Sequence, residues 1–291
     1  MGTRALLLVL PLAASVLAQK APAPQGAAIA APVATLESGF RKLYELNFEE
    51  ARGEFRLWEA GHAGDPMGAT AEAAAYLFEE LHKQGVLTSE FFLDDEKFLE
   101  GIEGKPTPHL KKGFFAALER GEKLIASRLK KDALDTDALY AQTMLTGMLG
   151  NYRSLLEKKH FEGVRLTEKA EGMAEELLEL KPDAQDAWLA IGASNYIVGC
   201  LPRHKRFFLW FGGVRGDRQE GMAQLKRAAE GGRLLRPHAK IMLALAALRE
   251  KDAALAERLF AELAEEFPRN PQFARELALL RKEEAGELSR P

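Results

Sequence analysis

Small and large apolar residues recur in this chain at a spacing that constrains its fold more than any other feature of the sequence. The clearest copy begins at Pro237, where Ala244, Ala256 and Phe260 supply two small residues and one large one on successive amphipathic segments. Pro271 follows Pro237 by 34 residues, and a fixed period of this length is typical of stacked helical repeats. Small residues let two helices approach closely, and large residues fill the layer between neighbouring pairs. The pattern therefore predicts an all-α chain of packed helix pairs.

A second copy lies near the start of the chain. Gly39, Phe48, Ala51 and Phe55 alternate small and aromatic residues at the same spacing. They predict a first helix over residues 36–46 and a second over residues 48–60.

A third copy crosses the middle of the chain. Pro182 is followed by Trp188 and then by Gly192, the order of a stop, an aromatic residue and a close-packing glycine. Ala170 belongs to the helix before Pro182 and shares a face with Leu177. Three matches in one phase place the same unit along the chain from residue 36 to the C-terminus.

These residues resemble the pattern of tetratricopeptide-repeat (TPR) proteins. The resemblance implies an α-solenoid of antiparallel helix pairs with a concave groove, which in TPR proteins usually binds a peptide or another protein. A shorter stretch, Ser194-Asn195-Tyr196 with Leu201-Pro202, Gly216-Asp217-Arg218 and Gly221, resembles the inclusion-body-clearance TPR family. From that second resemblance we take only the architecture.

The repeat phase predicts five helix pairs and one terminal helix. The pairs are expected at Leu36–Ala60, Pro66–Lys131, Asp135–Leu180, Asp183–Arg236 and Pro237–Phe267, and the terminal helix at Pro271–Glu284. The central pairs are longer than the template, which predicts insertions at Val86–Lys112, Leu149–Val164 and Leu201–Arg215. Within the first of these, Asp94 is expected to cap a short helix that ends at Gly101.

The N-terminus has the composition of an export signal. Arg4 precedes an apolar stretch that ends in Val16-Leu17-Ala18, a small-residue pattern cleaved by signal peptidases. We expect a signal peptide at residues 1–18, a flexible Ala/Pro-rich tether at residues 19–35 and the repeat domain at residues 36–291. The stretch holds no cysteine for a lipid anchor, so a periplasmic or secreted location is expected, and an uncleaved anchor is the alternative.

Composition excludes several classes of protein. The chain is 47% hydrophobic and 29% charged, with a formal net charge of −3, which is ordinary for a globular protein and argues against a nucleic-acid partner. Cys200 is the single cysteine, so no intramolecular disulfide can form. Its apolar neighbours favour a buried small side chain over a reactive thiol.

The most unusual segment follows Leu201, where basic residues precede four aromatic residues. Trp, Phe and Arg are the residue types that anchor protein interfaces, so we treat the segment as a candidate interface; its residues are Arg203, Lys205, Arg206, Phe207, Phe208, Trp210, Phe211 and Arg215. Two alternatives stay open: the aromatic residues fold back as an apolar plug, or they dock on an anionic membrane. Arg215-Gly216-Asp217 also spells an adhesive tripeptide, but Asp217 is better explained as a helix N-cap.

Catalytic chemistry has little support in the sequence. No phosphate-binding loop, nucleophile elbow or HExxH motif occurs, and no cofactor or metal is expected. Two Glu-x-x-His pairs, Glu79/His82 and Glu157/His160, carry the spacing used twice in helical di-metal sites, but chance and solvated helix faces explain them as well. Four large aromatic residues could line a pocket, although core packing is the commoner role at helical spacing: Tyr140, Tyr152, Trp188 and Tyr196.

Three functions remain at this level. The first is a non-catalytic scaffold that binds a protein or peptide in its groove, since repeat arrays form extended binding surfaces. The second is a small-molecule or lipid carrier, in which the insertion with Phe91, Phe92 and Phe98 covers an apolar cavity. The third is a helical metalloenzyme that uses the two Glu-x-x-His pairs. The sequence leaves the partner and the oligomeric state open.

Overall fold

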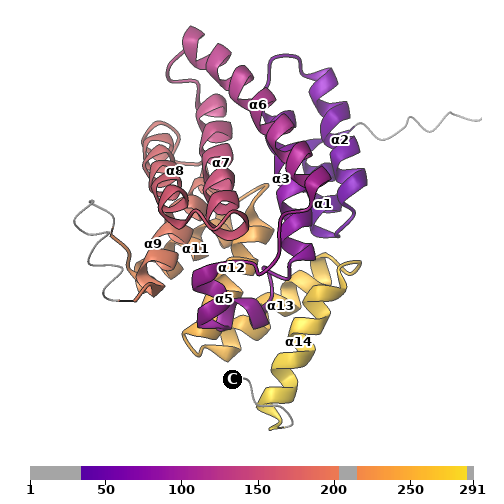
Figure 1. Cartoon of the computed structure of the whole chain (residues 1–291), viewed down its shortest axis with the longest axis vertical. Coiled ribbons are helices and arrows are strands. Elements are labelled where there is room, and N and C mark those ends of the chain that lie inside the picture. Colours follow the sequence, from indigo (N-terminus) through magenta and orange to yellow (C-terminus); the bar gives the residue numbers. More distant parts are fainter. Residues whose placement is uncertain (1–33, 203–214, 287–291) are drawn as a thin grey trace, which may run out of the picture. The chain divides into compact units, whose positions relative to one another are not determined.

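The computed structural model describes residues 34–202 and 215–286, all within one compact unit (Figure 1). Every regular element in this part of the chain is a helix. In chain order they are α1 (Leu36–Tyr44), α2 (Phe48–Gly61), α3 (Met67–Lys83), α4 (Ser89–Leu93), α5 (Asp95–Glu100), α6 (Pro108–Lys131), α7 (Thr136–Asn151), a π-helical turn η1 (Tyr152–Leu156), α8 (His160–Leu180), a 3-10 turn η2 (Gln185–Ala187), α9 (Trp188–Cys200), α11 (Arg218–Gly231), α12 (Arg236–Arg249), α13 (Ala253–Glu266) and α14 (Pro271–Glu284).

The helices pack as five consecutive pairs and a terminal helix. The pairs are α1/α2, α3/α6, α7/α8, α9/α11 and α12/α13, and α14 packs on α13. The first helices of the pairs also contact one another, from α1 through α3, α7 and α9 to α12. Pro237 and Pro271 both occupy the first turn of a helix, α12 and α14 respectively. The prediction of an all-α stack of TPR-like helix pairs is confirmed.

Side-chain caps explain where many of these helices begin. Thr35 and Ser38 form a reciprocal capping box at α1, with Thr35 Oγ1 accepting from the Ser38 amide at 3.0 Å. Asp217 accepts from two amides of the first turn of α11, and Asp94 does the same for α5, which ends before Gly101. The caps predicted at Asp94 and Asp217 are confirmed.

Glycine residues set the closest helix contacts. A Cβ on Gly192 of α9 would lie 2.6 Å from the Leu225 amide nitrogen of α11, and one on Gly221 of α11 would lie 2.5 Å from the Tyr196 amide nitrogen of α9. At the first pair, a Cβ on Gly39 would lie 2.2 Å from the ring of Phe55. These contacts allow no side chain, because backbone or buried ring atoms occupy the space.

The extra residues expected at 149–164 are present, but they form helix and no separate loop between the two helices of the pair. Helix α7 runs to Asn151 and continues as the π-helical turn to Leu156, and α8 begins at His160. The extra residues therefore lengthen the two helices of this pair. Gly150 and Gly163 allow the longer pair to stay close, since a Cβ on Gly163 would lie 2.9 Å from the Gly150 carbonyl oxygen.

The main apolar core includes residues of helices from α1 to α14, and a second, smaller cluster joins α7, α8, η2 and α9. Two first helices lie in the centre of the main core: residues 67–75 of α3 and residues 241–247 of α12 are buried on all sides. Residues 241–247 of α12 are all apolar, as expected of a helix buried in a core, whereas residues 67–75 of α3 include the buried Glu72, which pairs with Arg56 and Arg120. The sequence leaves undecided whether the groove implied by the resemblance to TPR proteins is open or filled, and in the described structure these stretches of α3 and α12 are buried.

Candidate binding surface on the inner side of the helix pairs

The inner side of the stack is the face formed by α3, α7, α9 and α12, and a segment of the chain itself covers it. This inserted segment, residues 84–107, joins α3 to α6 and contains α4 and α5. It is shorter than the predicted insertion because α6 begins at Pro108. In Figure 1 α5 lies in front of the middle of the stack, beside α12, and α4 contacts α12 directly.

An aromatic side chain and a carboxylate hold the inserted segment against α9 and α12. The buried ring of Phe92 lies nearly parallel to the ring of Tyr196 of α9, with centroids 6.4 Å apart and an interplanar angle of 11°. Arg249, the last residue of α12, donates to the Phe92 carbonyl oxygen at 2.6 Å and forms an ion pair with Asp95. The hydrogen bond from Arg249 to the Phe92 carbonyl oxygen is charge-assisted and therefore stronger than a neutral one, whereas the Asp95 side chain is 79% exposed, so solvent screens its ion pair with Arg249.

The surface beneath the inserted segment is organised by its own contacts. The Tyr196 hydroxyl donates toward the Ala246 carbonyl oxygen and the Glu250 carboxylate, each at 3.2 Å. Burial raises the pKa of Tyr196 well above its ordinary value, and the neighbouring Cys200 adds to that rise. Burial also raises the pKa of the Cys200 thiol, so Cys200 lacks the thiolate character of a nucleophile.

The other end of the inserted segment is bound by the terminal helix. Gln272 of α14 donates to the Leu87 carbonyl oxygen, and Glu276 of α14 accepts from the Ser89 amide at 3.4 Å. On the far side, the Ile102 amide donates to the Leu155 carbonyl oxygen of η1 at 3.1 Å. The inserted segment thus contacts four of its neighbours, η1, α9, α12 and α14, through main-chain and side-chain groups together.

Closure of the stack also brings its first and last pairs together. Tyr44 of α1 donates to the Leu234 carbonyl oxygen at 3.0 Å, and its ring lies 5.5 Å from that of Phe267. His238 of α12 packs edge-to-face on Phe78 of α3 at 4.8 Å, and its Nδ1 is enclosed without a hydrogen-bond partner. Burial lowers the pKa of His238 to about 4.

A buried carboxylate fixes the turn that leads into α12. Asp186 of η2 accepts from the amides of Arg233, Leu234 and Leu235 at 2.7, 3.0 and 3.2 Å, and from the Tyr140 hydroxyl at 2.9 Å. Burial raises the pKa of Tyr140 well above its ordinary value, and Asp186 adds to that rise.

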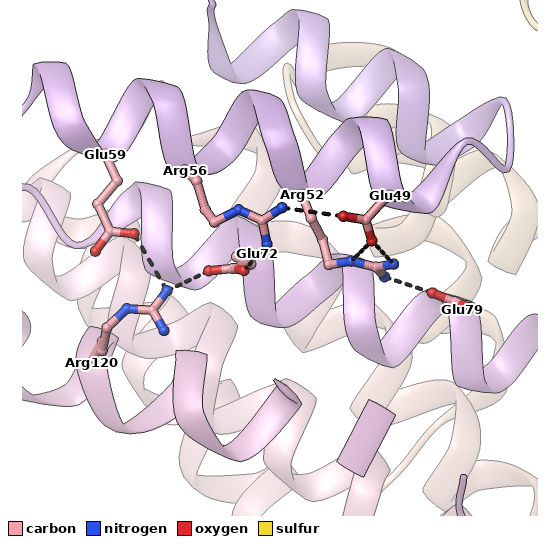
Figure 2. A network of polar contacts seen from close by, with 7 residues as sticks. All are labelled: Glu49, Arg52, Arg56, Glu59, Glu72, Glu79 and Arg120. Carbon is pink, nitrogen blue, oxygen red and sulfur yellow. Dashed lines mark hydrogen bonds and ion pairs between the residues drawn. The ribbon is translucent and has the colours of Figure 1, made fainter. Parts of the chain in front are cut away.

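Seven charged side chains form a network where α2, α3 and α6 meet (Figure 2): Glu49, Arg52, Arg56, Glu59, Glu72, Glu79 and Arg120. At its centre the buried Glu72 accepts from Arg56 at 2.9 Å and from Arg120. The buried Arg52 donates to Glu79 at 2.6 Å. Since these charges pair with one another across three helices, the network joins the first pair to the second and does not present a ligand site.

The structure offers no cavity for the carrier alternative at the closure of the first and last pairs. A cavity of about 20 Å³ lies there, enough for roughly one water molecule. Five of its lining residues are Leu43, Phe78, His82, Ile241 and Phe273. Phe91 and Phe92 of the inserted segment are buried in the core, and the Phe98 side chain lies outside the described part of the chain.

The two Glu-x-x-His pairs are engaged elsewhere. Glu79 accepts from Arg52 within the charged network, and His82 lies 3.2 Å from the side-chain oxygen of Gln272 through its Nδ1. Glu157 precedes α8 and forms ion pairs with three cations, Lys111, Arg153 and Lys159. Burial alone would raise the pKa of Glu157, but the hydrogen bonds and charges of Lys111 and Arg153 lower it to about 2. Within the described residues no group of three or more His, Cys, Asp or Glu side chains is placed to hold a metal ion.

The residues singled out in the sequence fall into two groups. Most of the candidate interface lies outside the described residues: Arg203, Lys205, Arg206, Phe207, Phe208, Trp210 and Phe211. Arg215 is described and exposed. The residues singled out for repeat packing lie between helices, where all except the half-buried Trp188 are buried: Gly39, Ala51, Phe55, Ala170, Trp188, Gly192, Ala244, Ala256 and Phe260.

Sequence reasoning missed the residues that build the inner surface. Arg249 belongs to no recognised motif, and Tyr196 was considered only within a stretch that resembles another TPR family and as one of four aromatic residues that could line a pocket. The inserted segment was predicted as extra length, but no signal in the sequence showed which face it covers.

No described helix is both long enough and apolar enough to cross a membrane.

Comparison with known proteins finds a likeness to a solved structure. No protein-family model and no curated protein matches the chain. The crystal structure of TTC0263, a thermophilic TPR protein of Thermus thermophilus, is similar over 85% of this chain and 99% of that one, at 15% identity and a TM-score of 0.42. The assignment of TPR-like helix pairs accordingly rests on the helices and contacts described above.

Proposed function

We propose that this protein is a non-catalytic scaffold that binds a protein or peptide on the inner side of its helix pairs. One observation carries the proposal: the inner side already holds a non-repeat stretch of polypeptide, the inserted segment. It does so with an aromatic ring, a captured main-chain carbonyl, a paired carboxylate and hydrogen bonds from α14. These are the contacts that anchor partners at protein interfaces.

Export and the candidate interface after Leu201 belong to the same proposal. Residues 1–18 have the composition of a signal peptide, which supports a periplasmic or secreted scaffold. The basic and aromatic residues from Arg203 to Arg215 support a second contact with the partner, and a peripheral membrane contact is the alternative for that segment. The small net charge supports a partner other than nucleic acid.

A crosslinking pull-down from the native cell envelope tests the proposal. The full chain is compared with two variants, Arg249→Glu on the inner side and Phe207/Phe208/Trp210→Ser in the segment after Leu201. Arg258→Glu, at an exposed position of α13, is the matched charge-reversal control. A protein captured by the full chain and the control, but lost by the folded Arg249→Glu variant, supports binding on the inner side. Equal capture by all four chains, or none by any, contradicts the proposed function.

A further inference from the structure

The inserted segment resembles a bound ligand more than a part of the repeat. Its two helices have five and six residues, far below the length at which a helix is stable alone in water. Within the segment, Gly85 precedes the two helices and Gly101 follows them, with φ angles of +68° and +79°, a left-handed conformation that breaks the helical path on both sides. Its helical structure therefore depends on the surface it covers.

Part of the surface that it covers is also held by contacts of its own, although Phe91 and Phe92 share the apolar core with that surface. Tyr196 is held by α12 through its hydroxyl, and the α9/α11 and α12/α13 pairs have their own close contacts. Arg249 ends α12, where its position is set by that helix. A binding surface with its anchors held in place loses little freedom when a ligand docks.

We infer that the inserted segment is an intramolecular ligand which occupies the inner side until a partner of the same chemistry displaces it. The inference rests on the proposed function and specifies its site. The ligand class follows from the contacts of Phe92 and Asp95: a peptide with an aromatic residue at the end of one short helix and, three residues later, a carboxylate at the start of the next, with an extended residue between them. The aromatic ring lies against Tyr196, and the carboxylate pairs with Arg249.

Because the inserted segment is tethered to the site that it occupies, it competes with any partner added in solution. A segment attached at both ends acts at an effective concentration in the millimolar range, so a weakly binding peptide cannot displace it. A partner must bind more tightly than the inserted segment, or engage a second surface at the same time. Loosening the inserted segment should therefore increase the affinity for peptides added in trans.

The test uses a fluorescein-labelled peptide with the sequence of residues 86–103 and the full chain with Phe92→Ala and Asp95→Lys together. Fluorescence polarisation should show saturable binding to this double variant, at least tenfold tighter than to the wild type. Adding Arg249→Glu should abolish that binding, while adding Arg258→Glu should leave it unchanged. A peptide that itself carries the two substitutions should not bind.

A double variant that folds, by circular dichroism and melting, yet binds the peptide no better than the wild type would overturn the inference. If the double variant does not fold, hydrogen exchange of the wild type decides. Amides of residues 89–100 should then exchange at least tenfold faster than those of residues 241–247, and equal rates would overturn the inference. If the inference fails, the proposed function still stands, provided that the envelope pull-down captures a partner which the folded Arg249→Glu variant loses.

Discussion

Replacing Gly192 with alanine tests the packing of the fourth helix pair most sharply. Gly192 lies where α9 and α11 come closest, and a Cβ there meets the Leu225 amide nitrogen at 2.6 Å and the Gly221 carbonyl oxygen at 3.0 Å. Both atoms belong to the backbone of α11, so no side chain can rotate to make room. The two helices must separate, which costs about 1–3 kcal/mol as overpacking does in a core.

The same substitution at Gly172 supplies a matched control. Gly172 lies in α8, is exposed and has no atom within 4 Å of a Cβ. Alanine there gains about 1 kcal/mol of helix propensity. The same gain accompanies Gly192→Ala, so the difference in unfolding free energy between the two variants isolates the packing cost.

Thermal and urea unfolding at neutral pH measure that difference. We expect Gly172→Ala to be more stable than Gly192→Ala by about 2 kcal/mol, or about 4–8 °C in Tm for a chain of this size. If Gly192→Ala melted at or above Gly172→Ala, the close approach of α9 and α11 would be refuted. Gly192→Trp and Ala256→Phe should destabilise the chain as well, since both add volume at buried contacts.

Three further predictions concern buried or paired charged groups. Asp186→Ala should cost about 3 kcal/mol in urea unfolding, because three amides and the Tyr140 hydroxyl lose their acceptor; an equally stable variant would contradict this role. Burial lowers the pKa of His238 to about 4. As the pH falls from 6.5 toward 4, the unfolded chain therefore takes up a proton at His238 that the folded chain does not, and the free energy of unfolding decreases. Wild type should lose about 2 kcal/mol more than His238→Leu between pH 7 and pH 5, and parallel pH profiles would refute the burial. The pKa of Glu157 is lowered to about 2, so its contribution to the free energy of unfolding is fully present above pH 4.5 and is lost as the pH falls through 2. With allowance for solvent screening, wild type should lose about 1 kcal/mol more than Glu157→Gln between pH 5 and pH 3. An equal loss in both proteins would contradict the ion cluster.

Local sequence patterns predicted the helix pairs well because each pattern acts within one or two turns. Asp94 and Asp217 cap the next residues along the chain, and small residues such as Ala244 and Ala256 mark helix faces at helical spacing. The π-helical turn of η1 was not predicted, because residues 149–164 contain no proline that would show whether the extra residues form a loop or lengthen the helices.

The inner surface could not be predicted because it depends on contacts between distant parts of the chain. Arg249 and Phe92 are 157 residues apart, and no periodicity relates them. The same holds for closure of the stack, where Asn270 donates to the Tyr44 carbonyl oxygen across 226 residues. Repeat patterns specify neighbouring pairs, whereas the occupant of the inner side is set by the tertiary fold. The candidate interface at residues 203–215 stays a prediction from composition.

Crosslinking mass spectrometry of the captured complex tests most directly whether a partner binds on the inner side. Lys97 of α5 follows Asp95 by two residues, and Lys251 follows Arg249 at the end of α12 by two residues. Asp95 and Arg249 form an ion pair. Lys123 of α6 and Lys226 of α11 are exposed on second helices of their pairs. The account predicts partner crosslinks at Lys97 and Lys251. Crosslinks confined to Lys123 and Lys226 would contradict it.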